Sequence, residues 1–267
     1  MNNSEGIVVR NLSMSYGDKV VLRGVSFDLP RGQTLAIIGR SGCGKTTLLK
    51  GVSALKEGDG GDILLGGRQI IAHGRALFEE WEIRRHVMMV GQTTSLLPWL
   101  SALRNIAIGL EVVQGMPRTQ AESRAREFAG ELGLSDALDQ YPEQLSGGQA
   151  QRVQLARVAV MQPEFLLLDE ITSGIDPQTI KEVIAALYRL RTLASGVDQT
   201  CVVVTHLLPF AYDFADRILF LHEGVSYEEG PAQAFAQQAT QRETQQFIES
   251  SMVACGRLQQ DDGGRGP

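Results

Sequence analysis

The sequence predicts an α/β fold in which a parallel sheet covered by helices carries an antiparallel β subdomain and an inserted helical subdomain. Three observations lead to this prediction. Several short runs are apolar throughout, as in strands buried on both faces of a parallel sheet. The N-terminal segment alternates short β-like runs with turn signals, which is typical of antiparallel sheet. From about residue 93 to residue 162 the strand signal disappears and helical patterns replace it.

The N-terminal segment predicts the antiparallel part of the fold. Its β-like runs are 7–9, 20–22 and 25–29, and turn signals stand at 16–18 and 30–32. Gly and Pro at these turns end one strand and start the next. We therefore expect an antiparallel sheet beside the parallel core.

Four apolar runs predict the parallel core, and polar residues follow each of them. The runs are 34–38, 86–90, 165–168 and 201–204. Parallel strands bring their carboxyl ends to one edge of a sheet, where ligands bind in open α/β sheets. We expect Gln92, Asp169, Glu170 and His206 to meet at the edge that also carries the loop after the first run.

That loop has the sequence of a phosphate cradle. Residues 39–46 read GRSGCGKT, which fits GxxxxGK followed by Ser or Thr, between an apolar run and a helical pattern. A structural glycine turn would not need Lys and Thr at its end. Backbone N–H groups would wrap phosphate oxygens, and Lys45 would reach the β- and γ-phosphates. The residues expected to bind the nucleotide here are Gly39, Arg40, Ser41, Gly42, Cys43, Gly44, Lys45, Thr46 and Thr47.

The chemical requirements of ATP hydrolysis suggest a role for each residue at this edge. Mg²⁺ prefers oxygen ligands, which Thr46, Asp169, phosphate oxygens and water can supply, with Gln92 as a further candidate. Glu170 lies next to the metal carboxylate and is the candidate base for the attacking water. The alternatives for Glu170 are a second Mg²⁺ ligand or a solvated carboxylate. His206 could hydrogen-bond the γ-phosphate and hold Glu170 and water in place.

A second glycine-rich motif lies in the helical stretch. Residues 145–149 read LSGGQ, in which Ser146 and Gln149 have the spacing of a capping box at a helix start. Gly147 and Gly148 leave backbone N–H groups uncovered at the positive end of that helix, where an anion can approach. The alternative is an ordinary capped helix that binds nothing.

Three further helices are expected. Residues 120–132 predict an amphipathic, charged helix. Asp176 and Pro177 predict a helix start, with Asp as the N-cap residue and Pro at the first position. This helix runs towards residue 194. Residues 232–252 look helical, and residues 261–267 are expected to be disordered.

With these motifs, the chain resembles the ATP-binding subunits of ABC transporters from about residue 7 to 251. The resemblance implies a P-loop NTPase (RecA-like) core at 6–92 and 163–240, a helical signature subdomain at 93–162, and a C-terminal helix and tail at 241–267, all within one domain, 1–267. It also implies that Tyr16 stacks on adenine, and it gives catalytic roles to Glu170, His206 and Lys45. The family's Walker A, Q-loop, signature, Walker B and switch motifs match 39–46, Gln92, 145–149, 165–170 and His206.

By that resemblance two copies, or this chain and a homologue, pair head to tail. ATP and Mg²⁺ then lie between the P-loop of one copy and Ser146, Gly147, Gly148 and Gln149 of the other.

The chain departs from the family pattern at three places. Ile171 stands where Pro usually follows the Walker B glutamate, and Gly174 and Ile175 replace the usual Ala and Leu. These changes put the geometry of the D-loop in question. Asp176 serves either as a helix cap or in the dimer interface. Val90 and Gly91 replace a more usual aromatic before Gln92.

Composition limits the function classes. The 25 Lys and Arg residues stand against 31 Asp and Glu, which gives a net charge of −6, and no basic run suggests a nucleic-acid partner. The N-terminus is polar, unlike a signal peptide, and no apolar run approaches the roughly 20 residues of a membrane span. Three scattered cysteines suit a reducing cytosol. Cys43 is either a small side chain at a tolerant position of the loop or a regulatory thiol. We expect a peripheral protein on the cytoplasmic face of the membrane.

The transported substrate is predicted from short strings. Residues 114–116 and 241–248 resemble polar amino-acid importers, whereas residues 96–100 look more like importers of nitrate or sulfonates. We favour amino-acid uptake, with permease subunits and a substrate-binding protein as partners. A short permease helix would dock near Gln92 and residues 96–99, unless that apolar stretch only packs inside the subdomain. An exporter ATPase, a soluble ABC-type ATPase in repair or translation, and a P-loop kinase or GTPase are the alternatives.

Overall fold

The computed structural model describes residues 6–173, 176–193 and 199–261. The chain divides into two compact units: unit 1 comprises Met1–Glu80 and Thr200–Pro267, and unit 2 comprises Trp81–Gln199. The domain boundaries expected from the sequence stay a prediction. No helix in the described part of the chain is both long enough and apolar enough to cross a membrane.

Unit 1 contains the antiparallel sheet expected near the N-terminus. Its strands follow the order β2-β1-β4-β5-β6, and each neighbouring pair is antiparallel. They are β1 (Ile7–Tyr16), β2 (Lys19–Leu29), β4 (Gly60–Leu65), β5 (Arg68–Ala72) and β6 (Arg75–Ala76). The runs 20–22 and 25–29 join into one strand, because Gly24 adopts a positive φ of 80° at an irregular stretch of the β1–β2 register. Glycine bears this conformation without steric cost.

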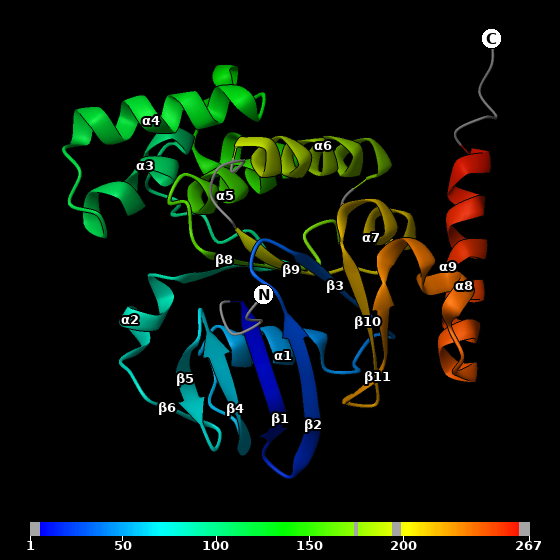
Figure 1. The fold of residues 1–267 in the computed structure, drawn as a ribbon. Coiled ribbons are helices and arrows are strands. Elements are labelled where there is room, and N and C mark those ends of the chain that lie inside the picture. Colours follow the sequence, from blue (N-terminus) through cyan, green and yellow to red (C-terminus); the bar gives the residue numbers. More distant parts are fainter. Residues whose placement is uncertain (1–5, 174–175, 194–198, 262–267) are drawn as a thin grey trace. The chain divides into compact units, whose positions relative to one another are not determined.

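Unit 1 also holds a sheet in the order β11-β10-β3-β9 (Figure 1). It consists of β3 (Thr34–Ile38), β9 (Thr200–Val204), β10 (Arg217–His222) and β11 (Val225–Pro231). β10, β3 and β9 run parallel, and β11 is antiparallel to β10. Every residue of β3 and β9 is buried, which confirms that these two apolar runs are core strands.

Helices of unit 1 follow its parallel strands. α1 (Lys45–Val52) comes after β3 and packs on β1, since a Cβ on Gly51 would lie 2.8 Å from the Met14 sulfur. α7 (Leu208–Phe214) comes after β9. The expected helix at 232–252 is divided into a 3₁₀ turn (Ala232–Ala234), α8 (Phe235–Gln238) and α9 (Arg242–Asp261). α9 buries Phe247 and Ile248. The disordered tail expected at 261–267 starts one residue too early, because Asp261 still belongs to α9, and residues 262–267 lie outside the described residues.

Unit 2 combines a parallel strand pair with helices. β7 (Val87–Val90) pairs with β8 (Phe165–Asp169), and Val90 lies opposite Leu168. The helices are α2 (Glu80–Arg84), α3 (Ala102–Val112), α4 (Arg118–Glu131), α5 (Gly147–Ala159) and α6 (Pro177–Leu193), of which α3 to α6 gather together in Figure 1. All regular elements between residues 93 and 162 are helical. α4 confirms the helix expected at 120–132, and the residues that it buries are three alanines spaced four residues apart.

Candidate functional site

The phosphate-loop sequence joins β3 to α1 in unit 1. Lys45 is the first residue of α1 and only 6% exposed, and its Nζ donates hydrogen bonds to the Gly39 oxygen at 2.9 Å and the Arg40 oxygen at 3.2 Å. The side chain therefore closes the loop on itself. The N-cap residue of α1 is Gly44, and no side chain caps this helix end. The uncapped N–H groups of a helix start attract anions.

The loop requires glycine at two positions. Gly39 has a φ of 153°, and a Cβ there would lie 2.3 Å from the Leu221 oxygen. Gly44 has a φ of 109°, and a Cβ there would lie 2.6 Å from Leu22 Cδ2. Any other residue would clash as well as strain the backbone. The glycines thus let the loop lie close against its neighbours in unit 1, while Thr46 is exposed at the start of α1.

His206 emerges at the same edge of the unit 1 sheet as the phosphate loop. Ile37, at the end of β3, pairs with Val204, at the end of β9. The Thr205 N–H donates to the Ile37 oxygen at 3.3 Å, and the Leu207 N–H donates to the Thr205 hydroxyl at 3.0 Å. This turn leaves the His206 side chain exposed.

Tyr16, the expected adenine platform, ends β1 and is about half exposed. One face of its ring lies beneath Lys56, whose Nζ is 4.5 Å from the ring centre. This cation–π contact keeps the phenol ring beside the lysine.

In unit 2 the acidic pair lies at the end of β8, whose last residue is Asp169. Asp169 is buried, and Glu170 adopts a φ of 45°, in the left-handed region. The Ser173 N–H donates to the Glu170 oxygen at 2.9 Å and closes a turn. A non-glycine residue at positive φ stores local strain, which proteins concentrate at functional sites. Ile171, the departure from the usual Pro, is buried, whereas Gly174 and Ile175 lie outside the described residues.

Gln92 contacts the same turn. Its Nε2 donates to the Ser173 hydroxyl at 3.0 Å. β7 and β8 are parallel with Val90 opposite Leu168, so Gln92 and the acidic pair leave the same edge of this strand pair. Unit 2 therefore brings Gln92 close to the turn that carries Glu170.

Gln154 is a residue that sequence reasoning missed. It lies on α5, is buried, and accepts a hydrogen bond from the Ser95 N–H at 3.2 Å. Its Nε2 lies 3.5 Å from the Gly91 oxygen and 3.4 Å from the Thr93 oxygen. The side chain thus holds both flanks of Gln92 against the helix that begins with the LSGGQ motif. The sequence shows only an amide four residues after Ala150 on α5, which does not by itself indicate a contact with this loop.

The LSGGQ motif starts α5 as predicted. Gln149 N–H donates to Ser146 Oγ at 3.2 Å, and Ser146 N–H donates to Gln149 Oε1 at 2.9 Å, which confirms the capping box. A Cβ on Gly148 would lie 2.5 Å from Thr179 Cγ2, whereas a Cβ on Gly147 would meet nothing within 4 Å. The two glycines therefore differ: one accommodates α6, and the other leaves the helix end open.

Asp176 is the N-cap residue of α6, as expected. Its Oδ1 accepts the N–H groups of Gln178 and Thr179, both at 3.1 Å, and its Oδ2 accepts the Thr179 hydroxyl at 2.5 Å. The Thr179 hydroxyl and N–H hold the pKa of Asp176 below its ordinary value. The capping role is confirmed, and a role for Asp176 in a dimer interface stays a prediction.

The structure thus assembles the expected residues in two sets. Unit 1 holds the phosphate loop and His206, and unit 2 holds Gln92, the acidic pair and the LSGGQ helix start. The meeting of the two sets around one nucleotide stays a prediction. Within the residues that the structure describes, no group of three His, Cys, Asp or Glu side chains could hold a metal ion.

Comparisons with known proteins agree on the family. A family profile described as "ABC transporter" matches residues 22–173. The L-cystine transport system ATP-binding protein TcyN of Escherichia coli (strain K12) is 38% identical over 252 residues, which cover 92% of this chain and 98% of that protein. The glutamine transport ATP-binding protein GlnQ of the same strain is 34% identical over 243 residues, 91% of this chain and 98% of that protein.

A solved structure agrees as well. It is a dimeric ATP-binding cassette in a post-hydrolysis state bound to ADP and Pi, with a TM-score of 0.74 and 29% identity, covering 85% of this chain and 98% of that one. The fold is that of a P-loop NTPase. The chain therefore belongs to the ABC transporter family, as an ATP-binding and ATP-hydrolysing subunit.

Proposed function

We propose that this chain hydrolyses ATP to drive the import of amino acids or related small polar solutes. The observation that carries the proposal is its likeness, over at least nine-tenths of its length, to subunits named for the transport of cystine and glutamine. Those likenesses cover 98% of each relative as well. The strings at 114–116 and 241–248 point the same way.

ATP binding would begin at the phosphate loop. The uncapped start of α1 offers backbone N–H groups to phosphate oxygens, and the Lys45 ammonium lies against the Gly39 and Arg40 oxygens of the same loop. Tyr16 presents an exposed aromatic face on which adenine can stack. Ser41, Thr46 and Thr47 complete the proposed nucleotide contacts.

The residues present fit Mg²⁺ only together with the nucleotide. The described part of the chain has no cluster of three acidic, histidine or cysteine ligands, and Mg²⁺ is usually held by one or two carboxylates plus phosphates and water. Asp169, the exposed Thr46 hydroxyl and Gln92 would be the protein ligands. Bound Mg²⁺ would neutralise charge on the β- and γ-phosphates.

Glu170 is the proposed base for the attacking water. The hydrogen bond from the Ser173 N–H to the Glu170 oxygen fixes the backbone from which the Glu170 side chain extends, and Gln92 holds the far end of the turn through the Ser173 hydroxyl. A carboxylate carried by a fixed turn can accept a proton from water with little reorganisation of the backbone. His206, exposed at the end of β9, would contact the γ-phosphate and hold the water and Glu170 in line.

A second copy of the chain, or a homologous subunit, would complete the site. The capped start of α5 is exposed at Ser146 and open at Gly147, so an anion from outside can reach its N–H groups. We infer that Ser146, Gly147, Gly148 and Gln149 contact the nucleotide bound by the partner copy. The dimeric arrangement of the solved relative supports this pairing.

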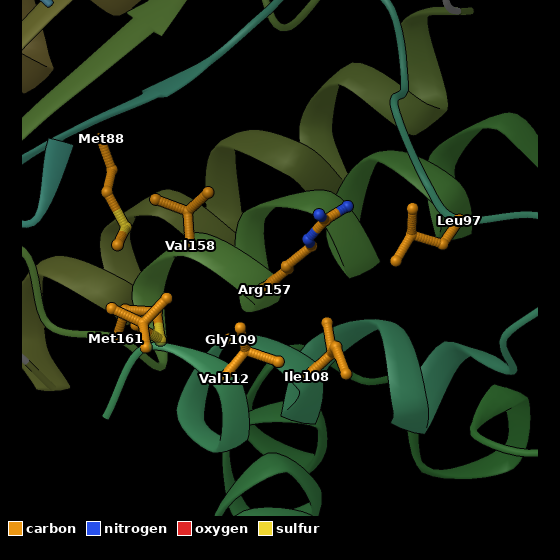
Figure 2. Close-up of a pocket in the computed structure, with 9 residues that line it drawn as sticks. Met88, Leu97, Ile108, Gly109, Val112, Arg157, Val158 and Met161 are labelled. Carbon is orange, nitrogen blue, oxygen red and sulfur yellow. The ribbon is translucent and has the colours of Figure 1, made fainter. Parts of the chain in front are cut away.

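Unit 2 offers a groove for the membrane partner. It has a volume of about 350 Å³ between α3 and α5, and we call it the docking groove (Figure 2). Its lining is mostly apolar and includes Met88, Leu97, Val112, Val158 and Met161. Val112 is 74% exposed, and Trp99, two residues beyond Leu97, is 69% exposed. We infer that a short cytoplasmic helix of a permease docks here and that the chain therefore lies at the cytoplasmic face of the membrane.

Reconstitution with the transporter tests the proposal. The proposed permease subunits and substrate-binding protein would be purified with this chain into proteoliposomes. We expect ATP-dependent uptake of an amino acid that the binding protein retains, and none with the Glu170→Gln variant. Uptake of nitrate or a sulfonate in place of amino acids would overturn the substrate class. ATP-driven efflux would overturn the direction.

A further inference from the structure

The docking groove contains one charged side chain, Arg157 of α5. Figure 2 shows Arg157 in the middle of the lining residues, reaching towards the side of Leu97, with Met88, Val158 and Met161 on its other side. Its Nη1 donates to the Ser95 oxygen at 2.9 Å. Within the described residues, no carboxylate lies within ion-pair distance of Arg157.

Other arginines of similar burial are paired. Arg104 pairs with Glu111 and Glu122, and Arg152 pairs with Glu182 at 3.0 Å. Arg157 differs because a half-buried guanidinium with five N–H donors uses only one of them on a described protein group. Burial also lowers the pKa of Arg157. The charge is thus partly desolvated without a counter-charge.

A segment bound in the groove would desolvate the unpaired charge of Arg157 further unless the segment carries a negatively charged group. A purely apolar segment would remove the remaining water from Arg157 and leave a buried unpaired charge, which is strongly unfavourable. A carboxylate matches the guanidinium through two parallel hydrogen bonds. The apolar walls require that the same segment also carry hydrophobic side chains.

We propose that the permease helix in the docking groove presents an Asp or Glu side chain to Arg157 and apolar side chains to Met88, Val158 and Met161. This inference rests on the proposed docking of a permease. Arg157 would then act as a specificity residue, which selects a permease helix with an acidic residue at the matching turn and rejects one with a lysine or arginine there.

The test measures how tightly the purified subunit binds its permease in nanodiscs. Arg157→Met keeps an unbranched side chain and removes its charge. Arg157→Lys keeps the charge but cannot form the two parallel hydrogen bonds of a guanidinium with a carboxylate. Arg126→Met, on the exposed face of α4, is the matched control. We expect at least about 30-fold weaker binding for Arg157→Met, because a buried charge partner is lost. The affinity of Arg157→Lys for the permease should lie between those of Arg157→Met and wild type, and the affinity of the Arg126→Met control should equal that of wild type.

Charge reversal separates pairing from misfolding. Arg157→Glu would be combined, one at a time, with Arg in place of each acidic residue in the permease's cytoplasmic loops. Recovery of binding with one of these replacements supports the pairing and identifies the acid, and no recovery with any of them overturns it. Arg157→Met binding as tightly as wild type also overturns the inference, while permease docking stands. Failure of the wild type to bind the permease would overturn the proposed function itself.

Discussion

Replacing Gly148 by Ala should push the LSGGQ helix away from α6. The added Cβ would lie 2.5 Å from Thr179 Cγ2, closer than non-bonded carbon atoms approach. Thr179 cannot turn its methyl group aside cheaply, because its hydroxyl is held by Asp176. Overpacking of this kind costs about 1–3 kcal/mol. Gly→Ala at a helix position with ordinary φ by itself adds about 0.4–1 kcal/mol of stability, so Gly148→Ala should lower the free energy of unfolding by up to about 2.6 kcal/mol.

Two matched variants isolate this clash. Gly147→Ala meets nothing within 4 Å and should be neutral or slightly stabilising. Thr179→Ser removes the methyl group that Gly148→Ala would strike and keeps the hydroxyl bonded to Asp176. The Gly148→Ala/Thr179→Ser double variant should therefore recover most of the stability lost by Gly148→Ala alone, as a favourable coupling in a double-mutant cycle.

Urea unfolding followed by circular dichroism would measure these free energies, with the slope of the transition checked for constancy. A clash between the Cβ added at position 148 and Thr179 is ruled out if Gly148→Ala costs as much stability in the Thr179→Ser background as in wild type, or if Gly147→Ala is equally destabilising. ATP hydrolysis adds a second contrast. Gly147→Ala should lower the activity of the dimer without loss of stability, because this glycine lies at the open helix end.

Further changes give separate expectations. Glu170→Gln should bind ATP normally, lose about 10²–10⁴-fold in phosphate release and elute as a dimer with ATP; a monomer would count against the proposed sandwich. Ser146→Arg should bind ATP as a monomer yet fail to hydrolyse it, and lost monomer binding would show that the motif contacts its own nucleotide. Gln154→Leu should lose hydrolysis and expose the 91–95 backbone to hydrogen exchange, which an unchanged exchange rate would contradict. Asp176 has a lowered pKa, so it stabilises the fold above its ordinary value of 3.8 and this contribution is lost as the pH falls through the lowered pKa. Asp176→Asn still caps α6 and should therefore lose less stability than wild type between pH 5 and 3 in an acid unfolding series; parallel curves would contradict this.

Local signals in the sequence predicted much of the fold and of the two residue sets. The capping box at Ser146, the cap at Asp176 and the fully buried runs at 34–38 and 201–204 are each specified within a few neighbouring residues. Short-range rules of helix capping and strand burial therefore sufficed for them.

Contacts between distant segments could not be predicted in this way. Gln154 holds residues 91–95 from about sixty positions away, and Arg152 bonds the Leu132 oxygen and Glu182 from α5. Nothing in the periodicity of α5 distinguishes an amide that binds a loop from one that faces solvent. Strand lengths were also missed, because an irregular register at Gly24 looks like a break between two runs.

The self-closed phosphate loop has a consequence for the cost of recognising a nucleotide. Lys45 ties Gly39 and Arg40 into a curved arrangement through the chain's own hydrogen bonds. The entropy cost of ordering this backbone is thus paid when the chain folds, and ATP would bind to a loop that is already preorganised. The ammonium would exchange carbonyl partners for phosphate oxygens, one charge-assisted bond for another. The backbone of residues 39–44 should therefore move little when ATP binds, and the larger movements would be left to the closure of two copies.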